Sequence, residues 1–468
     1  MSYDQAFQAL KDGDIKLAVP LLEKAAQETA YSSEAVNHAY TLALYRAGAK
    51  TRLADVAFEI GDSLVETNPA LALDYFQRAF WGGLDAACSR HIGEIFEGWA
   101  AAPAAPAKTL KRIAHVVGSL HEDHAPGRQV NMLVKSLQGL GVEQQVFTTE
   151  WAASWFFNEG NVPQSESSIS VPGAVIASIE GNFIERAERI ASAIRGFGAD
   201  ATFYHADFNE QITARVAAFR PTSIQVNVTH GAEMNPALFD GYIHLTKQGL
   251  TFPRRSAEPR EWIPAVTDID ERVQRCPPNM RQAMGLESAA TVSSTLGDLR
   301  PFADPAYLNA LTGLLKNFPN HFHIFAGSGD AKPVRAPLHA EGVLPRVRFL
   351  GAMSDAASIL AVTDVYLSPL KTSDDSSLLE AMGAGRPTVV LQHPGDPARN
   401  SSAELLGIQE LIASNEAEYA QIAQQLLRSE DERARCGNLV LSRFRSQFAP
   451  DLIGPRYLQF LSRIQQAG

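Results

Sequence analysis

The stretch that most constrains the fold runs from Val365 to Leu391 and predicts a strand, a loop, a helix, a turn and a second strand. An apolar run ends at Leu367, and the polar residues 371–376 separate it from an apolar helix pattern. Glycines at 383 and 385 and the proline at 387 end that helix, and residues 388–391 predict a buried strand. This order is typical of a parallel sheet covered by helices.

The polar loop leads directly into the first turn of the predicted helix, which is an arrangement typical of an anion-binding site. The first N–H groups of a helix lack partners within the helix, and the helix dipole favours negative charge at that end. Ser376 and Ser377 add hydroxyl donors, and Glu380 lies about one turn inside the helix. The alternative is an ordinary helix with a serine cap and a solvated glutamate, and this stretch alone leaves both interpretations open.

Length, charge and cysteine content limit the remaining choices. At 468 residues the chain is too long for one core of usual size, so two or three domains are expected. The formal net charge is −11 and no run of five Lys or Arg occurs, which argues against nucleic-acid binding. Three widely spaced cysteines indicate reduced thiols, and neither a signal segment nor an apolar run of membrane-spanning length is seen. The expected location is the cytoplasm.

Residues 1–98 carry apolar residues at helical spacing only, with breaks at Gly48, Asn68-Pro69 and Gly82-Gly83. Short helices separated in this way are similar to degenerate tetratricopeptide repeats, although no clean 34-residue period is present. The segment is expected to dock a partner or to form homo-oligomers, or alternatively to be a cap that covers the next domain. The Ala/Pro-rich residues 99–109 predict a linker.

Two regions of alternating strand and helix patterns follow, over 110–255 and 289–447, and predict parallel doubly wound sheets. Residues 256–288 are rich in Arg, Pro and charge and predict a connector, and residues 448–468 predict a C-terminal helix. Strands are expected at 113–117, 142–148, 201–205, 223–229, 290–294, 321–326, 347–350, 365–367 and 388–391. Helices are expected at 130–140, 184–197, 211–219, 356–362, 405–412 and 417–427, and after an Asp304 cap.

Histidines gather at or just past the strand ends of the first α/β region. Ligands of doubly wound sheets bind beyond the carboxyl ends of the strands, so these residues favour a functional site over separate structural roles. They are His121, His124, His205 and His230. No two of them have the spacing of a metal-binding pair, and no metal site is expected. In the second region, Gly327 and Gly329 form a turn where a backbone can approach a ligand closely.

The order of these segments resembles a GT-B glycosyltransferase. Residues 262–270 (WIPAVTDID) resemble the connector of family 4 glycosyltransferases, and residues 325–329, 347–351 and 379–387 (LEAMGAGRP) are typical of the nucleotide-binding half. Family 41, the O-GlcNAc transferase-like enzymes, is a closer match: segments similar to its own are FRPTSIQ at 219–225 and LLGIQELIASNEAEY at 405–419. The implied fold is two Rossmann-like domains facing a cleft, preceded by an all-α helical-repeat domain.

The resemblance also implies roles for single residues. Ser376 and Ser377 fall on the pair that holds the donor diphosphate, and Glu380 falls on an acidic residue that binds the ribose. Ala352 and Met353 fall where backbone groups pair with the base of the nucleotide. Gly327 and Gly329 are also expected on the donor side. His124 falls on the histidine that faces the reacting centre and is the expected base. The other acceptor-side candidates are His121, Arg128, His205 and His230.

The sequence departs from the family 41 pattern at three positions. Asp355 stands where the family has a lysine, and Ser358 and Asp375 stand where it has histidines. Arg300 or Lys371 is therefore expected to supply the missing cation. Thr372 stands where retaining family 4 enzymes carry a glutamate, which favours inversion of the sugar configuration.

The expected function is metal-independent, inverting transfer of a sugar from a nucleotide-sugar donor to an acceptor. The implied donor is UDP-linked and carries GlcNAc or another hexose, and the first expected acceptor is a protein side chain. No cofactor is expected, because helix N–H groups, hydroxyls and one cation can stabilise the leaving diphosphate. The alternatives are a non-catalytic scaffold with helical repeats, a family 4-like enzyme acting on a glycan or lipid, and an epimerase of the same fold.

Overall fold

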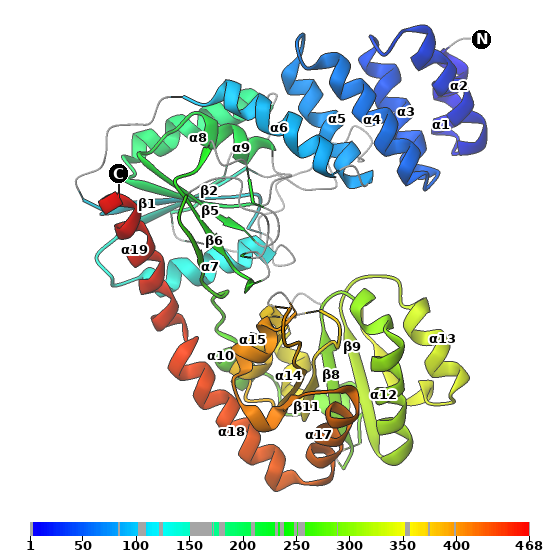
Figure 1. The fold of residues 1–468 in the computed structure, drawn as a ribbon, viewed down its shortest axis with the longest axis vertical. Coiled ribbons are helices and arrows are strands. Elements are labelled where there is room, and N and C mark those ends of the chain that lie inside the picture. The colour runs from blue at the N-terminus through cyan, green and yellow to red at the C-terminus, as the bar shows by residue number, and fades with distance from the viewer. Residues whose placement is uncertain are drawn as a thin grey trace.

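The computed structural model has a helical domain followed by two α/β domains, which we call the first lobe and the second lobe (Figure 1). The residues that it describes are 3–82, 85–101, 109–120, 125–149, 171, 173–176, 183–206, 211–229, 233–234, 238–247, 250, 258–287, 289–351, 356–372, 375–396 and 399–467. Within this described part, no helix combines the length and the apolar composition needed to span a membrane.

The helical domain consists of short antiparallel helices separated by the breaks that the sequence indicates. Gly13 and Gly48 have φ angles of +79° and +68°, which favour glycine, and Asp14 caps the second helix by accepting a hydrogen bond from Leu17 N at 3.2 Å. The helices are α1 (Tyr3–Lys11), α2 (Ile15–Glu28), α3 (Glu34–Arg46), α4 (Lys50–Leu64), α5 (Pro69–Gly82) and α6 (Asp85–Trp99).

The helical domain packs directly against the first lobe, beside which it lies in Figure 1. One continuous apolar core joins residues of α1–α6 to residues of the first sheet and of α9 (Gln211–Ala218). The Arg215 guanidinium of α9 lies 4.3 Å from the centre of the Trp99 ring, and Ala101 N donates to Ala218 O at 2.9 Å. This packing supports the interpretation of the helical segment as a cap on the next domain, while leaving its outer surface available.

The first lobe contains a fully parallel sheet in the order β3-β2-β1-β4-β5-β6-β7. Its central strands are buried along nearly their whole length, which agrees with helices covering both faces. The strands are β1 (Arg112–Val117), β2 (Glu143–Thr148), β3 (Val175–Ile176), β4 (Ala201–His205), β5 (Ile224–Thr229), β6 (Gly241–His244) and β7 (Arg260–Trp262), and the other helices are α7 (Ala125–Leu137) and α8 (Phe183–Phe197). The sequence placed residues 256–288 in the connector, whereas β7 pairs with β6 as part of the sheet.

The second lobe repeats this topology in the order β10-β9-β8-β11-β12-β13, again with parallel pairing. The strands are β8 (Thr291–Leu296), β9 (His321–Ala326), β10 (Val347–Phe349), β11 (Val365–Leu367), β12 (Thr388–Leu391) and β13 (Ile412–Ala413). The helices are α12 (Pro305–Asn317), α13 (Lys332–Ala340), α14 (Ala357–Val362), α15 (Asp375–Gly383), α16 (Ser401–Leu406), α17 (Glu416–Arg428) and α18 (Glu430–Gln447), with 3₁₀ turns η4 (Arg300–Ala303), η5 (Leu344–Arg346) and η6 (Gln409–Leu411). The expected fold class, α/β with two Rossmann-like domains behind an all-α domain, is confirmed.

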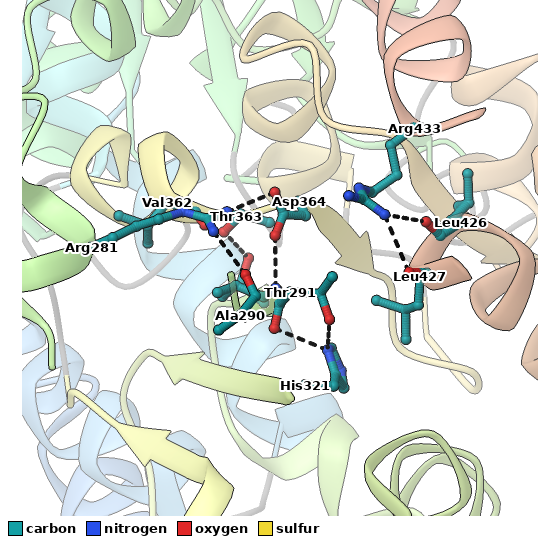
Figure 2. A network of polar contacts seen from close by, with 12 residues as sticks. Arg281, Ala290, Thr291, His321, Val362, Thr363, Asp364, Leu426, Leu427 and Arg433 are labelled. Atoms are coloured by element: carbon teal, nitrogen blue, oxygen red, sulfur yellow. Dashed lines mark hydrogen bonds and ion pairs between the residues drawn. The ribbon is translucent and has the colours of Figure 1, made fainter. Parts of the chain in front are cut away.

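The connector between the lobes forms α10 (Ile269–Gln274) and α11 (Met280–Ala283), and α11 is fixed to the second lobe by Arg281. Figure 2 shows this guanidinium reaching the Ala290 and Val362 carbonyl oxygens at 2.8 and 3.1 Å and the Asp364 carboxylate at 2.6 Å. Asp364 in turn accepts from Val292 N at 2.8 Å. These contacts lie where β8 and β11 begin, at the edge of the sheet opposite to its carboxyl ends.

The last helix, α19 (Pro450–Ala467), returns from the second lobe to the first along one side of the molecule (Figure 1). Its buried side chains, among them Ile453, Tyr457 and Phe460, belong to the same core as Ile113 and Phe203 of the first sheet. The Tyr457 and Phe203 rings meet edge to face at 5.4 Å. The chain therefore crosses between the lobes twice, once at the connector and once between α18 and α19.

Candidate functional site

The topology itself indicates where a ligand of each lobe would lie. In the strand orders above, the chain direction across the sheet reverses between β1 and β4 in the first lobe and between β8 and β11 in the second. Ligands of open parallel sheets bind beyond the carboxyl ends of the strands at such switch points. In the second lobe this position is bordered by the end of β8 and by the loop that leads from β11 into α15.

Glycines line the carboxyl edge of the second sheet. A Cβ atom added to Gly327, which follows β9, would lie 1.5 Å from the carbonyl oxygen of Gly297, which follows β8. Gly297 N donates to Ala326 O at 2.9 Å, and Gly327 N donates to Gly351 O at 2.8 Å. Gly297 and Gly329 have φ angles of +106° and +111°. The loops after β8, β9 and β10 thus stack so closely that only glycine fits at position 327.

Ser377 connects the first turn of α15 to this glycine edge. Its hydroxyl donates to Leu296 O, the last residue of β8, at 3.5 Å, and lies 3.6 Å from the position that a Cβ of Gly297 would take. Ser376 beside it is exposed. The two predicted hydroxyls therefore stand at the switch point together with the N-terminus of a nine-residue helix, which attracts anions.

Asp375, the first residue of α15, is buried and has partners from both lobes. Its carboxylate accepts from Ser401 Oγ at 2.7 Å, from Ser402 Oγ at 3.2 Å and from Lys247 N of the first lobe at 3.3 Å. Burial raises the pKa of this carboxyl, although these hydrogen bonds act in the opposite direction. The residue had been noted only as a departure from the family pattern, because its partners are distant in the sequence.

Through its contact with Asp375, Lys247 connects the carboxyl edges of the two sheets. It follows β6, its ammonium group pairs with Glu404 of α16, and the same group lies 4.8 Å from the centre of the Trp262 ring. The Lys247 contact with Asp375 thus places the region after β6 against the start of α15. Residues of both lobes therefore meet at the start of α15.

Glu380 lies near the connector rather than in open solvent. Its carboxylate is 3.7 Å from the Arg272 guanidinium of α10, and its side chain is 28% exposed. Arg272 also donates to Asp268 at 2.8 Å. The carboxylate therefore keeps an accessible part and has a cationic neighbour on α10.

Both expected replacement cations are paired with carboxylates and remain largely exposed. Arg300 Nε lies 3.0 Å from Asp298, and this contact lowers the pKa of the Asp298 carboxyl. Lys371, in the loop after β11, pairs with Asp304, which also caps α12 by accepting from Tyr307 N. Because Asp304 follows η4 and Lys371 follows β11, this pair brings the loops on the two sides of the switch point together.

In the first lobe, His205 lies at the end of β4, as expected, but its side chain has no exposed surface. Its Nε2 is 3.1 Å from His115 Nδ1, and His115 Nε2 is 3.2 Å from Gln144 Oε1. Burial lowers the pKa of His115 to about 4, so this histidine is neutral at pH 7. In this conformation His205 supports its neighbours and has no surface with which to contact an acceptor.

The remaining candidates lie in the first turn of α7 or outside the described residues. Arg128 stands in the first turn of α7 and is partly exposed. His121, His124, His230, Ala352 and Met353 lie outside the described residues, and their roles stay predictions.

A polar group that the sequence did not indicate lies at the same edge of the first sheet. The Glu233 carboxylate, in the segment after β5, is bonded to His244 Nε2 at 2.8 Å and to Arg260 Nη2 at 2.7 Å. Burial acts to raise the pKa of Glu233, but the bonds from His244 and Arg260 outweigh it and the pKa is lowered. The sequence pattern assigned Arg260 to the connector and did not predict that it belongs to strand β7.

Comparison with solved structures gives the same fold. A mutant of the O-GlcNAc transferase of Thermobaculum terrenum superimposes with a TM-score of 0.56 and 18% identity, over 99% of this chain and 96% of that protein. A glycosyltransferase of Rickettsia africae gives 0.57 and 12% identity, over 77% and 100%. Anabaena HepE, solved with UDP and glucose, gives 0.56 and 14% identity, over 75% and 100%. The first of these similarities includes the helical domain, and the other two cover about three quarters of the chain.

No curated protein matches the chain in a sequence search. Residues 306–429 match the family model described as "Glycosyl transferases group 1". The matched segment runs from α12 to α17 and includes Gly327, Lys371, Ser377 and Glu380. The prediction of a glycosyltransferase is confirmed to that extent: the second lobe carries a group 1 glycosyl transferase domain within a GT-B fold.

Proposed function

We propose that this chain transfers a sugar from a uridine diphosphate donor to a protein side chain, without a metal and with inversion at the anomeric carbon. The observation that carries the donor half of this proposal is the glycine-lined edge at the β8/β11 switch point, with Ser377 bonded across it to Leu296 O. A diphosphate at that edge would meet helix N–H groups, two hydroxyls and closely approaching backbone. Anabaena HepE, which has the same fold, was solved with UDP and glucose.

The chemistry requires that negative charge developing on the leaving diphosphate be stabilised. Fixed dipoles at the start of α15 and the Ser376 and Ser377 hydroxyls supply donors that need no reorganisation during the reaction. Arg300 and Lys371 lie on the two sides of the switch point and add cationic charge. Each is held by a carboxylate, so a diphosphate would compete with Asp298 and Asp304 for these side chains.

The acceptor must lose a proton as its oxygen or nitrogen attacks the sugar. We assign this step to His124, which directly precedes Ala125 in the sequence and which, as a histidine, has an unperturbed pKa near neutrality. Inversion follows from direct attack opposite the leaving diphosphate, and Thr372 leaves the position of the retaining-enzyme glutamate without a carboxylate.

A protein acceptor is supported by the helical domain, which is joined to the first lobe through a shared core. The similarity to the Thermobaculum terrenum O-GlcNAc transferase extends over this domain as well as both lobes, and it favours assignment to family 41. Three cysteines that are widely spaced in the sequence, Cys88, Cys276 and Cys436, favour a reducing compartment such as the cytoplasm.

Donor binding is tested first, by thermal shift with UDP, GDP, ADP and CDP. We expect UDP to raise the melting temperature, since saturation at 100 times the Kd adds about 2.7 kcal/mol of stability. Ser377→Ala should weaken UDP binding about tenfold, the effect of one hydrogen bond to a charged group. Ser462→Ala, which removes a hydroxyl bonded within α19, is the matched control. No shift with any nucleotide would favour the non-catalytic scaffold.

Transfer is tested by incubating the chain with radiolabelled UDP-sugars and whole-cell lysate, followed by separation of protein, lipid and glycan fractions. We expect label on a protein band and loss of that label in His124→Ala. A His124→Ala variant with the full rate would remove this residue from the role of base. Label recovered only with glycan or lipid would assign the acceptor to the family 4-like alternative, and label found only in an altered free nucleotide sugar would indicate an epimerase.

A further inference from the structure

A cavity separate from the donor edge lies in the helical domain between α3 and α5. It has a volume of about 440 Å³, within the range of small-ligand sites. The side chains that decide its chemistry are Glu34 and His38 of α3 and Leu71, Asp74, Tyr75 and Arg78 of α5. The resemblances and the donor-site argument give no role to these residues.

Arg78 is a buried member of the cavity lining, with 5% of its surface exposed. Its Nη1 donates to Thr41 Oγ1 at 2.7 Å, and its Nη2 donates to Asp74 at 2.7 Å and lies 3.2 Å from His38 Nδ1. Its guanidinium lies 4.8 Å from the centre of the Tyr75 ring. Its Nε is buried and has no hydrogen-bond partner in the described part of the chain. A buried donor of this kind is costly unless an acceptor reaches it.

The contact with Arg78 also fixes the protonation of His38. A guanidinium can only donate hydrogen bonds, so His38 Nδ1 must accept and the ring proton resides on Nε2. Burial and then the charge of Arg78 lower the pKa of His38. The ring is therefore neutral at pH 7 and brings no positive charge to the cavity.

The cavity lining carries an excess of negative charge. Arg78 is neutralised by Asp74, with which it forms an ion pair that is largely buried on the arginine side. Glu34 is exposed, and among the described residues no cation is paired with it. Two carboxylates against one guanidinium leave a charge of −1 at the opening. Leu71 beside them offers an apolar surface to the stem of a long side chain.

We propose that this cavity binds a basic side chain, arginine or lysine, presented by a polypeptide partner. The cationic head pairs with Glu34 and the outer part of Asp74, and the aliphatic stem packs on Leu71. A backbone carbonyl of the bound polypeptide accepts a hydrogen bond from Arg78 Nε or from His38 Nε2. The negative charge of the cavity favours a cationic group. A small cation would leave the hydrogen-bond donors and the apolar wall without contacts, whereas a peptide can contact both.

The test uses the full chain and three fluorescein-labelled peptides of the sequence Ac-Gly-Ser-X-Gly-Ser-Gly, in which X is arginine, lysine or glutamine. Fluorescence anisotropy is measured at low ionic strength without any nucleotide sugar, so the result does not depend on the proposed transferase activity. We expect binding of the arginine and lysine peptides and at least about tenfold weaker binding of the glutamine peptide, as for loss of a charge-assisted pair. Added salt should weaken binding of the basic peptides.

Glu34→Gln is the informative variant, because an exposed side chain can be changed without disturbing the core. We expect it to weaken binding of the basic peptides about tenfold. Glu66→Gln, which neutralises another exposed carboxylate of the same domain, is the control and should leave the affinity unchanged. Equal affinities of the three peptides, no effect of Glu34→Gln, or no binding at millimolar peptide would overturn the proposal. Competition by agmatine as strong as that by the arginine peptide would overturn the polypeptide assignment.

Discussion

Replacing Asp375 by alanine tests whether the start of α15 is held by both lobes. The change removes the acceptor of the Lys247 amide and of the Ser401 and Ser402 hydroxyls. The hydroxyls can rotate toward other acceptors, whereas the Lys247 amide cannot. Leaving the partly buried Lys247 amide and the two hydroxyls without this acceptor costs about 1–3 kcal/mol, and part of this is offset because a buried carboxylate is removed. We expect a net loss of about 2 kcal/mol, and therefore about 30-fold faster opening of this contact.

Hydrogen exchange followed by mass spectrometry measures this opening directly. Peptides covering 241–247 and 375–383 should exchange about 30-fold faster in Asp375→Ala, while peptides from the helical domain should be unchanged. Glu404→Gln is the control, since it removes only the partly exposed partner of the Lys247 ammonium group and such pairs contribute about 0–1 kcal/mol. Exchange in Asp375→Ala that equals the wild type would refute the connection between the lobes.

The same residue predicts a pH dependence. Burial raises the pKa of Asp375, so the folded chain binds this proton more tightly than the unfolded chain. The stability that the protonated carboxyl contributes is fully present below the unfolded pKa of about 3.9 and is lost as the pH rises through the folded pKa. Asp375→Asn lacks this group. The stability of the wild type minus that of Asp375→Asn, from urea titrations, should decrease from about pH 4 toward neutrality; an increase would contradict the assigned direction.

Other predictions concern the glycine edge, the connector and the ribose contact. Gly327→Ala places a Cβ 1.5 Å from the Gly297 carbonyl oxygen and should lower the free energy of unfolding, measured by urea denaturation, by at least about 3 kcal/mol. The control Gly313→Ala in α12, where a Cβ meets nothing, should raise it by up to about 1 kcal/mol. Similar effects of both variants would refute the close approach. Arg281→Ala should lower stability by about 2 kcal/mol with unchanged UDP affinity by calorimetry, because its bonds lie at the opposite edge of the sheet. Glu380→Gln should weaken UDP binding about tenfold, and unaltered binding would undo the ribose assignment.

The local pattern of the sequence predicted those elements whose apolar residues follow one clear period. Strand β9 is predicted with its observed bounds, and α8 and α14 differ from the prediction by one residue at one end. In contrast, α18 was missed because only a narrow stripe of a highly charged helix is buried, made up of Cys436, Gly437, Val440 and Phe444. Strand β7 was missed because three partly exposed residues carry no alternation that could be recognised.

The candidate site shows a similar division. Ser377 and the Gly327 turn could be found because a polar loop before a helix and a glycine after a strand have local physical meanings. The Asp375 contacts could not, since Lys247 and Ser401 are remote in the sequence and meet only when both sheets are formed. The Glu233, His244 and Arg260 group depends likewise on the pairing of β6 with β7.

The return of α19 to the first lobe has a consequence for biosynthesis. The first sheet is translated long before Ile453, Tyr457 and Phe460, which cover one of its apolar faces. While the ribosome is still producing the second lobe, only α7 residues such as Leu133 and Leu137 can pack on that face, so the first α/β unit cannot complete its core before α19 is made. The nascent polypeptide must therefore keep this apolar surface from associating with other chains until residues 450–467 have been translated.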